Sequence, residues 1–419
     1  LVSPLAMLLF AALVHRVAPL RTSLREDLRV AGRDRVASRP YYRSEQESEA
    51  RHGYTRIVRP VVSTVTTTIT PTIKTTHATV TDEVFVVVAP EKRRSKTCIL
   101  WTPGFGRYFS HTAAFDDFNR GQRPGDPDID LLGLDLPRYG RAYVERGYDT
   151  PGNEFNSVAH PAPGSGHKWC RFYYGAYAGA LDILVNELGY EEIYVMCNST
   201  AGLTFQCFVE DVLRHELHSS KVYSKVRGAV FTAPFWYPSK RGEFPLSVLP
   251  VFVFNFLAYC FPNLIMDSDM EGHVSWFDTF FEELLQEQKE DQDAGRDTRC
   301  SMPAQDPWYN PVHNSPYYIE WLAMAAEAQR FIDSCAWTRG KNQAKAAAPL
   351  PALCLMNNVQ DKNVCVRRCG ELFNQLYPGM ELNLIPDLNH EAMLSRKVPY
   401  AVALQSIRHF ILSTRSCTR

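Results

Sequence analysis

Short apolar runs alternate with longer amphipathic stretches along much of the chain, beginning near residue 97. The apolar runs contain few polar interruptions, which is typical of strands that are buried on both faces of a parallel sheet. The stretches between them have the length of ordinary helices. We therefore expect an α/β domain in which helices cover both faces of a mainly parallel sheet. The pattern predicts strands at 97–101, 129–136, 191–196, 226–234, 351–356 and 381–386, and helices at 108–120, 169–188, 201–215, 364–376 and 398–413.

The residues before this alternation follow other patterns. "PLAMLLFAALV", residues 4–14, has about the length of a signal-peptide core and is too short for an ordinary membrane span. As a signal it would direct the chain to the secretory pathway or a membrane; as a loosely packed terminus it would leave the chain cytoplasmic. Residues 16–60 are rich in Arg and predict a mobile arm. Residues 61–88 are rich in Thr and Val, which favours edge strands over an O-glycosylated stalk.

The alternation breaks between residues 235 and 348. Residues 245–266 are strongly apolar, but Pro245, Pro250 and Pro262 interrupt them. Because prolines break helices, a mostly helical cap inserted over the sheet explains this segment better than a membrane span. The expected organisation is an N-terminal apolar segment and arm (1–60), a first part of the α/β core (61–234), a cap or lid (235–348) and a second part of the core (349–419).

Charge and cysteine content exclude some partners. The chain of 419 residues has 45 basic and 46 acidic side chains and a formal net charge of −1. Such a balance gives no reason to expect a polyanionic partner, so nucleic acid is not expected. The eleven cysteines lack metal-type spacing and are interpreted mainly as small buried hydrophobes. We therefore expect neither a metal nor a cofactor.

One of the predicted buried strands ends at a serine. In "EEIYVMCNSTAGLTFQCF", residues 191–208, the strand runs directly into Ser199 and then into a predicted helix. A strand, a turn with small residues around a serine, and a helix form the nucleophile elbow, which lifts the hydroxyl above the sheet. Neither flank of Ser199 is Gly, and a serine in this place, taken alone, is more often a helix cap.

Two later residues favour catalysis. Asp361 follows the strand predicted at 351–356, and His390 follows the strand predicted at 381–386. A catalytic serine needs a base within hydrogen-bond reach, an acid that orients the base, and donors for the oxyanion. The order Ser, Asp, His, each after a strand, is the order of α/β-hydrolases. We therefore expect Ser199, Asp361 and His390 to form a catalytic triad.

Other acids and histidines are weaker candidates. Asp387 lies three residues before His390 and is interpreted as a solvated loop residue, whereas Asp135 is interpreted as stabilising a turn. The remaining candidates have no ordered acid nearby in the sequence and are interpreted as surface or core histidines: His111, His160, His167 and His273.

From about Val84 to Phe410 the chain resembles the α/β-hydrolase superfamily, and within it the branch of monoacylglycerol lipases and lysophospholipases. The resemblance is carried by "ILWTPGFGRYFSH", "LDLPRYGRA" and "CNSTAG" and by the Asp and His loops. The chain departs from the family at Pro103 and Asn198, where the family has His, and at Cys197, where it has Gly. Cys197 or Asn198 could strain the elbow, and Cys197 is the first residue to inspect for strain.

The resemblance implies roles for particular residues. Ser199 would be the nucleophile, His390 the general base and then acid, and Asp361 the partner that orients the imidazole. The oxyanion donors would be the backbone N–H groups of Phe105 and Thr200. The implied reaction is hydrolysis of carboxylic esters through an acyl-enzyme intermediate.

The predicted cap guides the expected substrate. Its aromatic and aliphatic density suits an acyl chain and peripheral contact with a membrane, although the same residues could form the core of the cap itself. We predict a small, lipid-like ester, such as a monoacylglycerol or a lysophospholipid. The alternatives are a peptidase or acyltransferase with the same triad, and a catalytically inactive interaction protein with the α/β-hydrolase fold.

Overall fold

The computed structural model describes the sheet, its principal helices and the loops that carry the candidate residues. The described residues are 53–68, 74–104, 118, 128–146, 169–238, 286, 289–290, 293–294, 319–341, 350–358, 361, 363–390, 392–395 and 397–416.

Eight strands form a single open sheet in the order β1-β2-β4-β3-β5-β6-β7-β8. All neighbouring strands from β4 to β8 are parallel, whereas β2 runs antiparallel to both β1 and β4. The predicted, mainly parallel α/β sheet is confirmed. The strands are β1 (Tyr54–Thr68), β2 (Lys74–Pro90), β3 (Thr97–Thr102), β4 (Asp130–Asp135), β5 (Glu192–Asn198), β6 (Val226–Thr232), β7 (Ala352–Asn357) and β8 (Glu381–Ile385).

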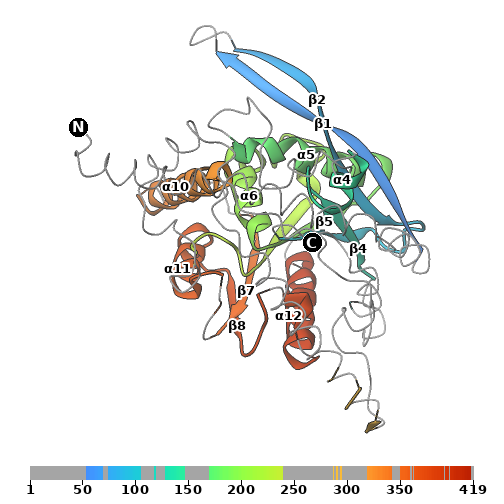
Figure 1. Ribbon diagram of the computed structural model, residues 1–419, viewed down its shortest axis with the longest axis vertical. Helices are drawn as coiled ribbons and strands as arrows, with labels where there is room; N and C mark the ends of the chain where they lie inside the picture. Colours follow the sequence, from blue (N-terminus) through green and yellow to red (C-terminus); the bar gives the residue numbers. More distant parts are fainter. Residues whose placement is uncertain are drawn as a thin grey trace, which may run out of the picture.

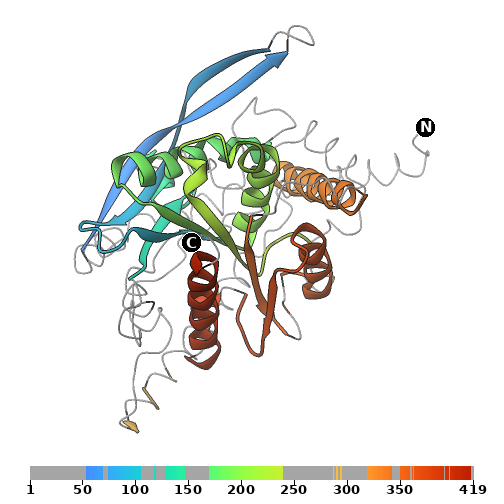
Figure 2. The same cartoon turned by 180° about the vertical axis from the view of Figure 1, so that it is seen from behind.

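Helices cover both faces of the sheet (Figures 1 and 2). On one face lie α5, α6, α10 and α11, and α12 lies on the other. The described helices are α4 (Gly140–Glu145), α5 (Tyr174–Asp182), α6 (Thr200–Phe208), α7 (Arg214–Glu216), α10 (Ile319–Lys341), α11 (Val366–Leu376) and α12 (Lys397–Ser416). A 3-10 turn precedes α5, and π-helical turns continue α5 and α6. Of the helix predicted at 108–120, the described residues include only Phe118.

The central strand β5 shows why its sequence reads as almost continuously apolar. Val195 and Cys197 pack into the core on the α6 side of the sheet, whereas Tyr194 and Met196 pack into the core on the α12 side. All four side chains are fully buried. Because successive side chains of a strand point to opposite faces, a strand covered on both faces needs apolar residues at every position.

The sheet begins earlier than the sequence predicted. β1 starts at Tyr54, so the end of the segment predicted as a mobile arm (16–60) belongs to a strand. Arg59 and Pro60 are exposed on the edge strand, and the pairing of β1 with β2 shifts register between Pro60 and Val62. Proline is tolerated at such an edge irregularity, which explains why a polar, proline-containing stretch forms a strand.

The hairpin of β1 and β2 extends well beyond the rest of the sheet (Figures 1 and 2). β1 pairs with β2 from Tyr54 opposite Pro90 to Thr68 opposite Lys74. The next strand, β4, pairs only with Val86, Val87 and Val88 of β2. Among the residues that the structure describes, no third strand pairs with the distal part of the hairpin.

Of the segment predicted as a cap, the structure describes mainly α10. Its buried face is rich in alanine and packs into the same core as α6 and α11. Most of residues 239–318, including the apolar stretch 245–266, lies outside the described residues, so the cap remains a prediction. Within the described part of the chain, no helix combines the length and apolar character needed to cross a membrane.

Candidate active site

Ser199 occupies a strained turn between β5 and α6. Its backbone has φ +49° and ψ −118°, a combination that side chains with a Cβ rarely adopt. Three backbone hydrogen bonds hold this turn: Ser199 N donates to Thr232 O (3.0 Å), while Ser199 O accepts from Gly202 N (3.0 Å) and Phe235 N (2.9 Å). The neighbouring strand and the first turn of α6 thus impose the geometry that presents the hydroxyl.

Two glycines allow other segments to approach this turn. A Cβ on Gly104, in the loop after β3, would lie 2.9 Å from Ser199 Cβ. A Cβ on Gly202 would lie 2.9 Å from Pro234 Cβ. Cys197, the first residue to inspect for strain, is a regular and fully buried residue of β5, paired with Thr102 of β3. The positive φ therefore falls on Ser199, the predicted nucleophile, and the wider side chain at 197 fits into the core.

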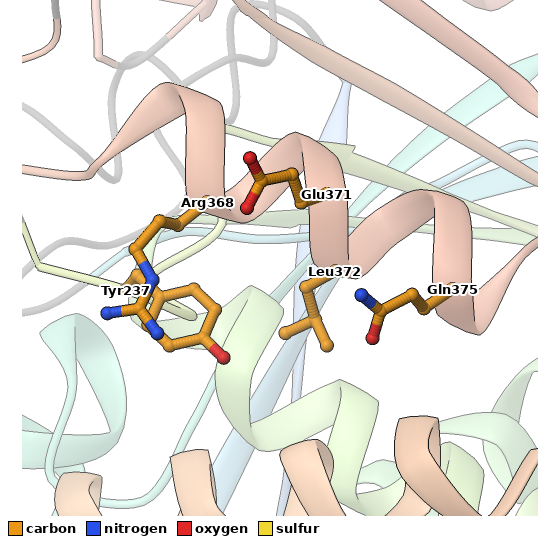
Figure 3. A pocket seen from close by; sticks show the side chains of 5 residues that line it. All are labelled: Tyr237, Arg368, Glu371, Leu372 and Gln375. Atoms are coloured by element: carbon orange, nitrogen blue, oxygen red, sulfur yellow. The ribbon is translucent and has the colours of Figure 1, made fainter. Parts of the chain in front are cut away.

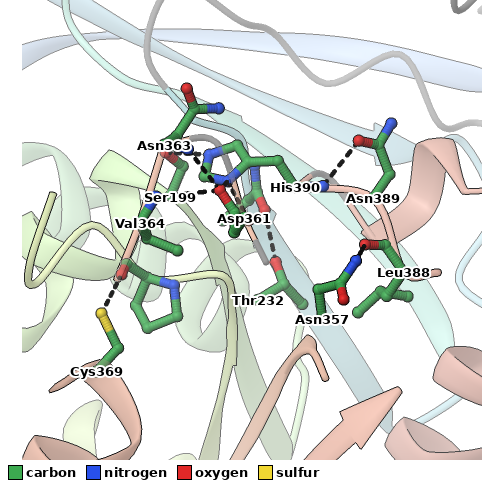
Figure 4. Close-up of polar contacts among 12 residues, drawn as sticks. Ser199, Thr232, Asn357, Asp361, Asn363, Val364, Cys369, Leu388, Asn389 and His390 are labelled. Atoms are coloured by element: carbon green, nitrogen blue, oxygen red, sulfur yellow. Dashed lines mark hydrogen bonds and ion pairs between the residues drawn. The ribbon is translucent and has the colours of Figure 1, made fainter. Parts of the chain in front are cut away.

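The predicted acid and base lie together beside this serine (Figure 4). His390 Nε2 is 2.8 Å from Ser199 Oγ. On the other side of the ring, His390 Nδ1 is 2.8 Å from Asp361 Oδ2 and 3.0 Å from Asp361 Oδ1. The three residues follow β5, β7 and β8, which are parallel strands whose carboxyl ends meet at one edge of the sheet.

Asp361 is held as a buried carboxylate. Its side chain is 2% exposed, and its Oδ1 accepts hydrogen bonds from Asn363 N (2.7 Å) and Val364 N (3.0 Å). Burial by itself raises the pKa of Asp361, but the adjoining His390 ring and the two backbone donors outweigh it, so the pKa lies below its ordinary value. An ionised Asp361 favours the imidazole tautomer with a proton on Nδ1, which leaves Nε2 free to accept the Ser199 proton.

The loop of Asp361 is braced by the segment that leaves β6. Tyr237 O accepts a hydrogen bond from Cys365 N (2.8 Å), and Pro238 pairs with Val364. The Tyr237 hydroxyl donates to Asp333 on α10, and the guanidinium of Arg368 lies over the tyrosine ring at 4.1 Å from its centroid (Figure 3). A small pocket there is lined by residues of this segment and α11 and by no triad residue: Tyr237, Arg368, Glu371, Leu372 and Gln375.

The predicted oxyanion donors are only partly within the described residues. Thr200 is the first residue of α6 and is buried next to Ser199. N–H groups in the first turn of a helix lack partners within the helix and lie at its positive end, so they suit a developing oxyanion. Phe105 lies outside the described residues, although Gly104 before it approaches Ser199 closely. Both donors therefore remain predictions.

The alternative acids have other surroundings. Asp135 is fully buried, and its Oδ2 accepts hydrogen bonds from Arg141 Nη1 (2.8 Å) and Arg141 N (3.1 Å). Asp387 is exposed in the turn after β8 and has φ +56°. The alternative histidines lie outside the described residues: His111, His160, His167 and His273. No three His, Cys, Asp or Glu side chains converge as metal ligands among the residues that the structure describes.

Two residues that support the loop of His390 were missed in the sequence. Asn357 Nδ2 donates to Leu388 O (2.8 Å), and Ser395 Oγ accepts from Asn389 N (2.8 Å). Figure 4 shows Asn357 beside Leu388 at the end of β7. The only feature of the sequence that could have indicated a supporting role for Asn357 is its position as a polar residue at the end of a buried strand. No feature of the sequence indicates such a role for Ser395.

Comparison with solved structures identifies the fold. A lipase in its open form superposes with a TM-score of 0.52 at 12% identity, covering 85% of this chain and 99% of the lipase. A thermostable carboxyl esterase from Bacillus coagulans, in complex with glycerol, has a TM-score of 0.50 at 12% identity, with 85% and 99% covered. A soluble variant of monoglyceride lipase from Saccharomyces cerevisiae, in complex with a substrate analog, has a TM-score of 0.49 at 10% identity, with 85% and 97% covered.

No protein-family model matches the chain, and no curated protein matches its sequence. The identities to the solved structures are low, so these structures establish the fold and not the reaction. The chain therefore has the α/β-hydrolase fold that its sequence resembles.

Proposed function

We propose that this protein is a serine hydrolase that cleaves carboxylic esters through an acyl-enzyme intermediate. The observation that carries the proposal is the position of His390, whose Nε2 lies 2.8 Å from Ser199 Oγ while its Nδ1 lies 2.8 Å from Asp361. This is the arrangement that a weak alcohol nucleophile requires for activation. The structural similarity to a lipase and an esterase supports the same reaction class.

In the first half of the reaction, His390 Nε2 takes the proton of Ser199 while Oγ attacks the ester carbonyl carbon. The carbonyl oxygen becomes an oxyanion, which the N–H groups of Thr200 and Phe105 would stabilise. The intermediate then collapses, the bond to the alcohol breaks, and His390 returns its proton to the departing oxygen. The acyl group remains as an ester on Ser199.

In the second half, water replaces the alcohol. His390 takes a proton from the water, whose oxygen attacks the acyl carbon, and the bond to Ser199 Oγ breaks as His390 gives the proton back. Asp361 stays ionised throughout and stabilises the imidazolium that forms in each half. The products are a carboxylic acid, an alcohol and the free enzyme, and no step draws on a metal or cofactor.

We further propose a lipid-like substrate, such as a monoacylglycerol or a lysophospholipid. The apolar and aromatic residues of 245–266, in the predicted cap, suit an acyl chain and a peripheral contact with a membrane surface. The likeness to a lipase in its open form supports this choice. The esterase in complex with glycerol is also consistent with a small ester whose alcohol is glycerol-like.

A fluorophosphonate probe tests the proposed nucleophile. Wild-type protein should be labelled, and the Ser199→Ala variant, folded to the same extent by circular dichroism, should not. An acyl-chain series of nitrophenyl esters tested beside amino-acid arylamides then separates an esterase from a peptidase. Folded wild-type protein that shows no labelling dependent on Ser199 would leave only the inactive interaction protein.

A further inference from the structure

His390 lies in a short loop whose position must be set by its neighbours. β8 ends at Ile385, and the next helical turn begins at Ala392. Asn357 and Ser395 hold the backbone at Leu388 and Asn389. These two contacts position the residues before the base, but they do not connect the base to the strand that carries the nucleophile.

Asn198 makes that connection. It is the last residue of β5, directly before Ser199, and is 2% exposed. With its nitrogen turned toward the neighbouring carbonyl groups, its amide donates to His390 O (3.1 Å) and to Thr232 O (3.0 Å), and this nitrogen also lies 2.8 Å from Thr232 Oγ1. In the opposite orientation Asn198 Oδ1 accepts a hydrogen bond from Thr232 Oγ1 (2.8 Å), but the same oxygen then faces the carbonyl oxygens of Thr232 and His390, which repel it.

Thr232 O therefore receives two donors at once. One is the N–H of Ser199 (3.0 Å), which belongs to the strained turn, and the other is the amide of Asn198 (3.0 Å). Thr232 is almost completely buried at the end of β6. The Thr232 carbonyl group thus holds both the backbone N–H of Ser199 and the Asn198 amide, which in turn donates to His390 O.

We propose that Asn198 is a positioning residue, which sets the separation of the His390 imidazole from Ser199 by joining the loop of the base to the ends of β5 and β6. The inference rests on the proposed serine hydrolase function. Removing the amide leaves the His390 carbonyl without this donor and frees the loop to move. A displacement of about 1 Å between reacting groups costs on the order of a hundredfold in rate.

Two variants of Asn198 and one control test the proposal. Asn198→Asp keeps the shape of the side chain but removes the donors, and Asn198→Ala removes the group altogether. Tyr194→Phe is the matched control, because Tyr194 is also buried on β5 and its hydroxyl bonds Ile411 O (3.2 Å) and Thr414 Oγ1 (2.8 Å) on α12. Tyr194 lies four residues before Asn198 in the sequence, about 13 Å along the strand.

The first readout is the rate at which a fluorophosphonate labels Ser199. Both Asn198 variants should be labelled about 10- to 100-fold more slowly than wild type. The labelling rate of Tyr194→Phe should stay within about twofold of wild type, even if this variant loses as much melting temperature as the Asn198 variants do. Equal labelling rates for the Asn198 variants and the control, in folded protein, overturn the inference. Wild type that is not labelled at all overturns the proposed function instead.

A second readout does not depend on activity. The proton on His390 Nδ1, shared with Asp361, should give a low-field proton NMR signal, which is assigned by its loss in His390→Ala. The signal should persist in Ser199→Ala and Tyr194→Phe and should weaken or vanish in Asn198→Ala. An unchanged signal in Asn198→Ala, or no such signal in wild type, refutes a positioning role whether or not the protein hydrolyses esters.

Discussion

The backbone of Ser199 offers a direct test of whether the elbow stores strain. Ser199→Ala and Ser199→Gly both remove the hydroxyl and its contact with His390. They differ in the Cβ, which alanine keeps and glycine lacks. Because φ +49° with ψ −118° is costly only for a residue with a Cβ, the glycine variant should be the more stable of the two.

The magnitude follows from two opposing terms. A non-glycine residue in such a sparsely populated backbone region costs about 1–3 kcal/mol, and glycine relieves that cost. Glycine also gives the unfolded chain more freedom, which lowers stability by about 0.4–1 kcal/mol. Taking the middle of each range, the free energy of unfolding of Ser199→Gly should exceed that of Ser199→Ala by about 1.3 kcal/mol, which is close to a tenfold difference in the folding equilibrium.

Urea unfolding at neutral pH measures the difference. The free energy of unfolding should depend on urea concentration with the same slope in both variants, since they expose the same surface on unfolding. The midpoint of unfolding should lie at a higher urea concentration for Ser199→Gly than for Ser199→Ala. Both should fail to react with a fluorophosphonate, which confirms that the gain in stability accompanies loss of the nucleophile. An alanine variant as stable as the glycine variant would show that the turn is not strained in solution.

Three further predictions concern neighbouring groups. The folded-state pKa of Asp361 is lowered, so the ionised carboxylate contributes stability that is complete above its ordinary pKa of about 3.9 and is lost as the pH falls through the folded value. The stability advantage of wild type over Asp361→Asn in urea unfolding should therefore shrink below about pH 4; an advantage independent of pH contradicts this. Gly104→Ala would place a Cβ 2.9 Å from Ser199 Cβ and should slow fluorophosphonate labelling by about 10- to 100-fold. Gly370→Ala on α11, where the nearest atom is a flexible leucine methyl at 3.3 Å, should label normally, and equal rates for the two variants would refute the clash. Burial raises the pKa of Cys369 to about 12, so iodoacetamide should modify it only in unfolded protein; mass spectrometry that finds it alkylated in native protein would disprove its burial.

The sequence predicted the sheet and the proximity of Ser199, Asp361 and His390 because both depend on local patterns. Buried strands need apolar residues at every position, so β3 to β7 were recognisable, and Ser199 and Asp361 each follow such a strand. His390 follows β8, whose residues are mostly exposed or half-buried. The loops that follow parallel strands lie at the same edge of the sheet. The positions of the three residues after such strands were therefore enough to predict that their side chains lie close together. The start of β1 was missed because an exposed edge strand tolerates the polar side chains and the proline that elsewhere indicate an arm.

The details that the sequence could not provide depend on long-range contacts. Asn198 is 192 positions from His390 in the sequence, and nothing in the residue type indicates that its amide meets that carbonyl group. The position of the strain could not be predicted for a similar reason: the positive φ lies at Ser199 and not at Cys197. The space available to a strand residue is set by its neighbours, here Thr102 on β3, and only the folded structure shows that the thiol fits.

The positions of Ser199, Asp361 and His390 along the chain also determine when each residue becomes available during synthesis. Ser199 and His390 are separated by 191 residues, which at the usual rate of synthesis of about 5–20 residues per second corresponds to roughly 10–40 s. During that interval β3, β4, β5 and β6 can already pair, since all four precede residue 233. On the proposed function, a growing chain would therefore present its serine without acid or base, and the nascent protein would remain inert toward esters until β7 and β8 complete the sheet.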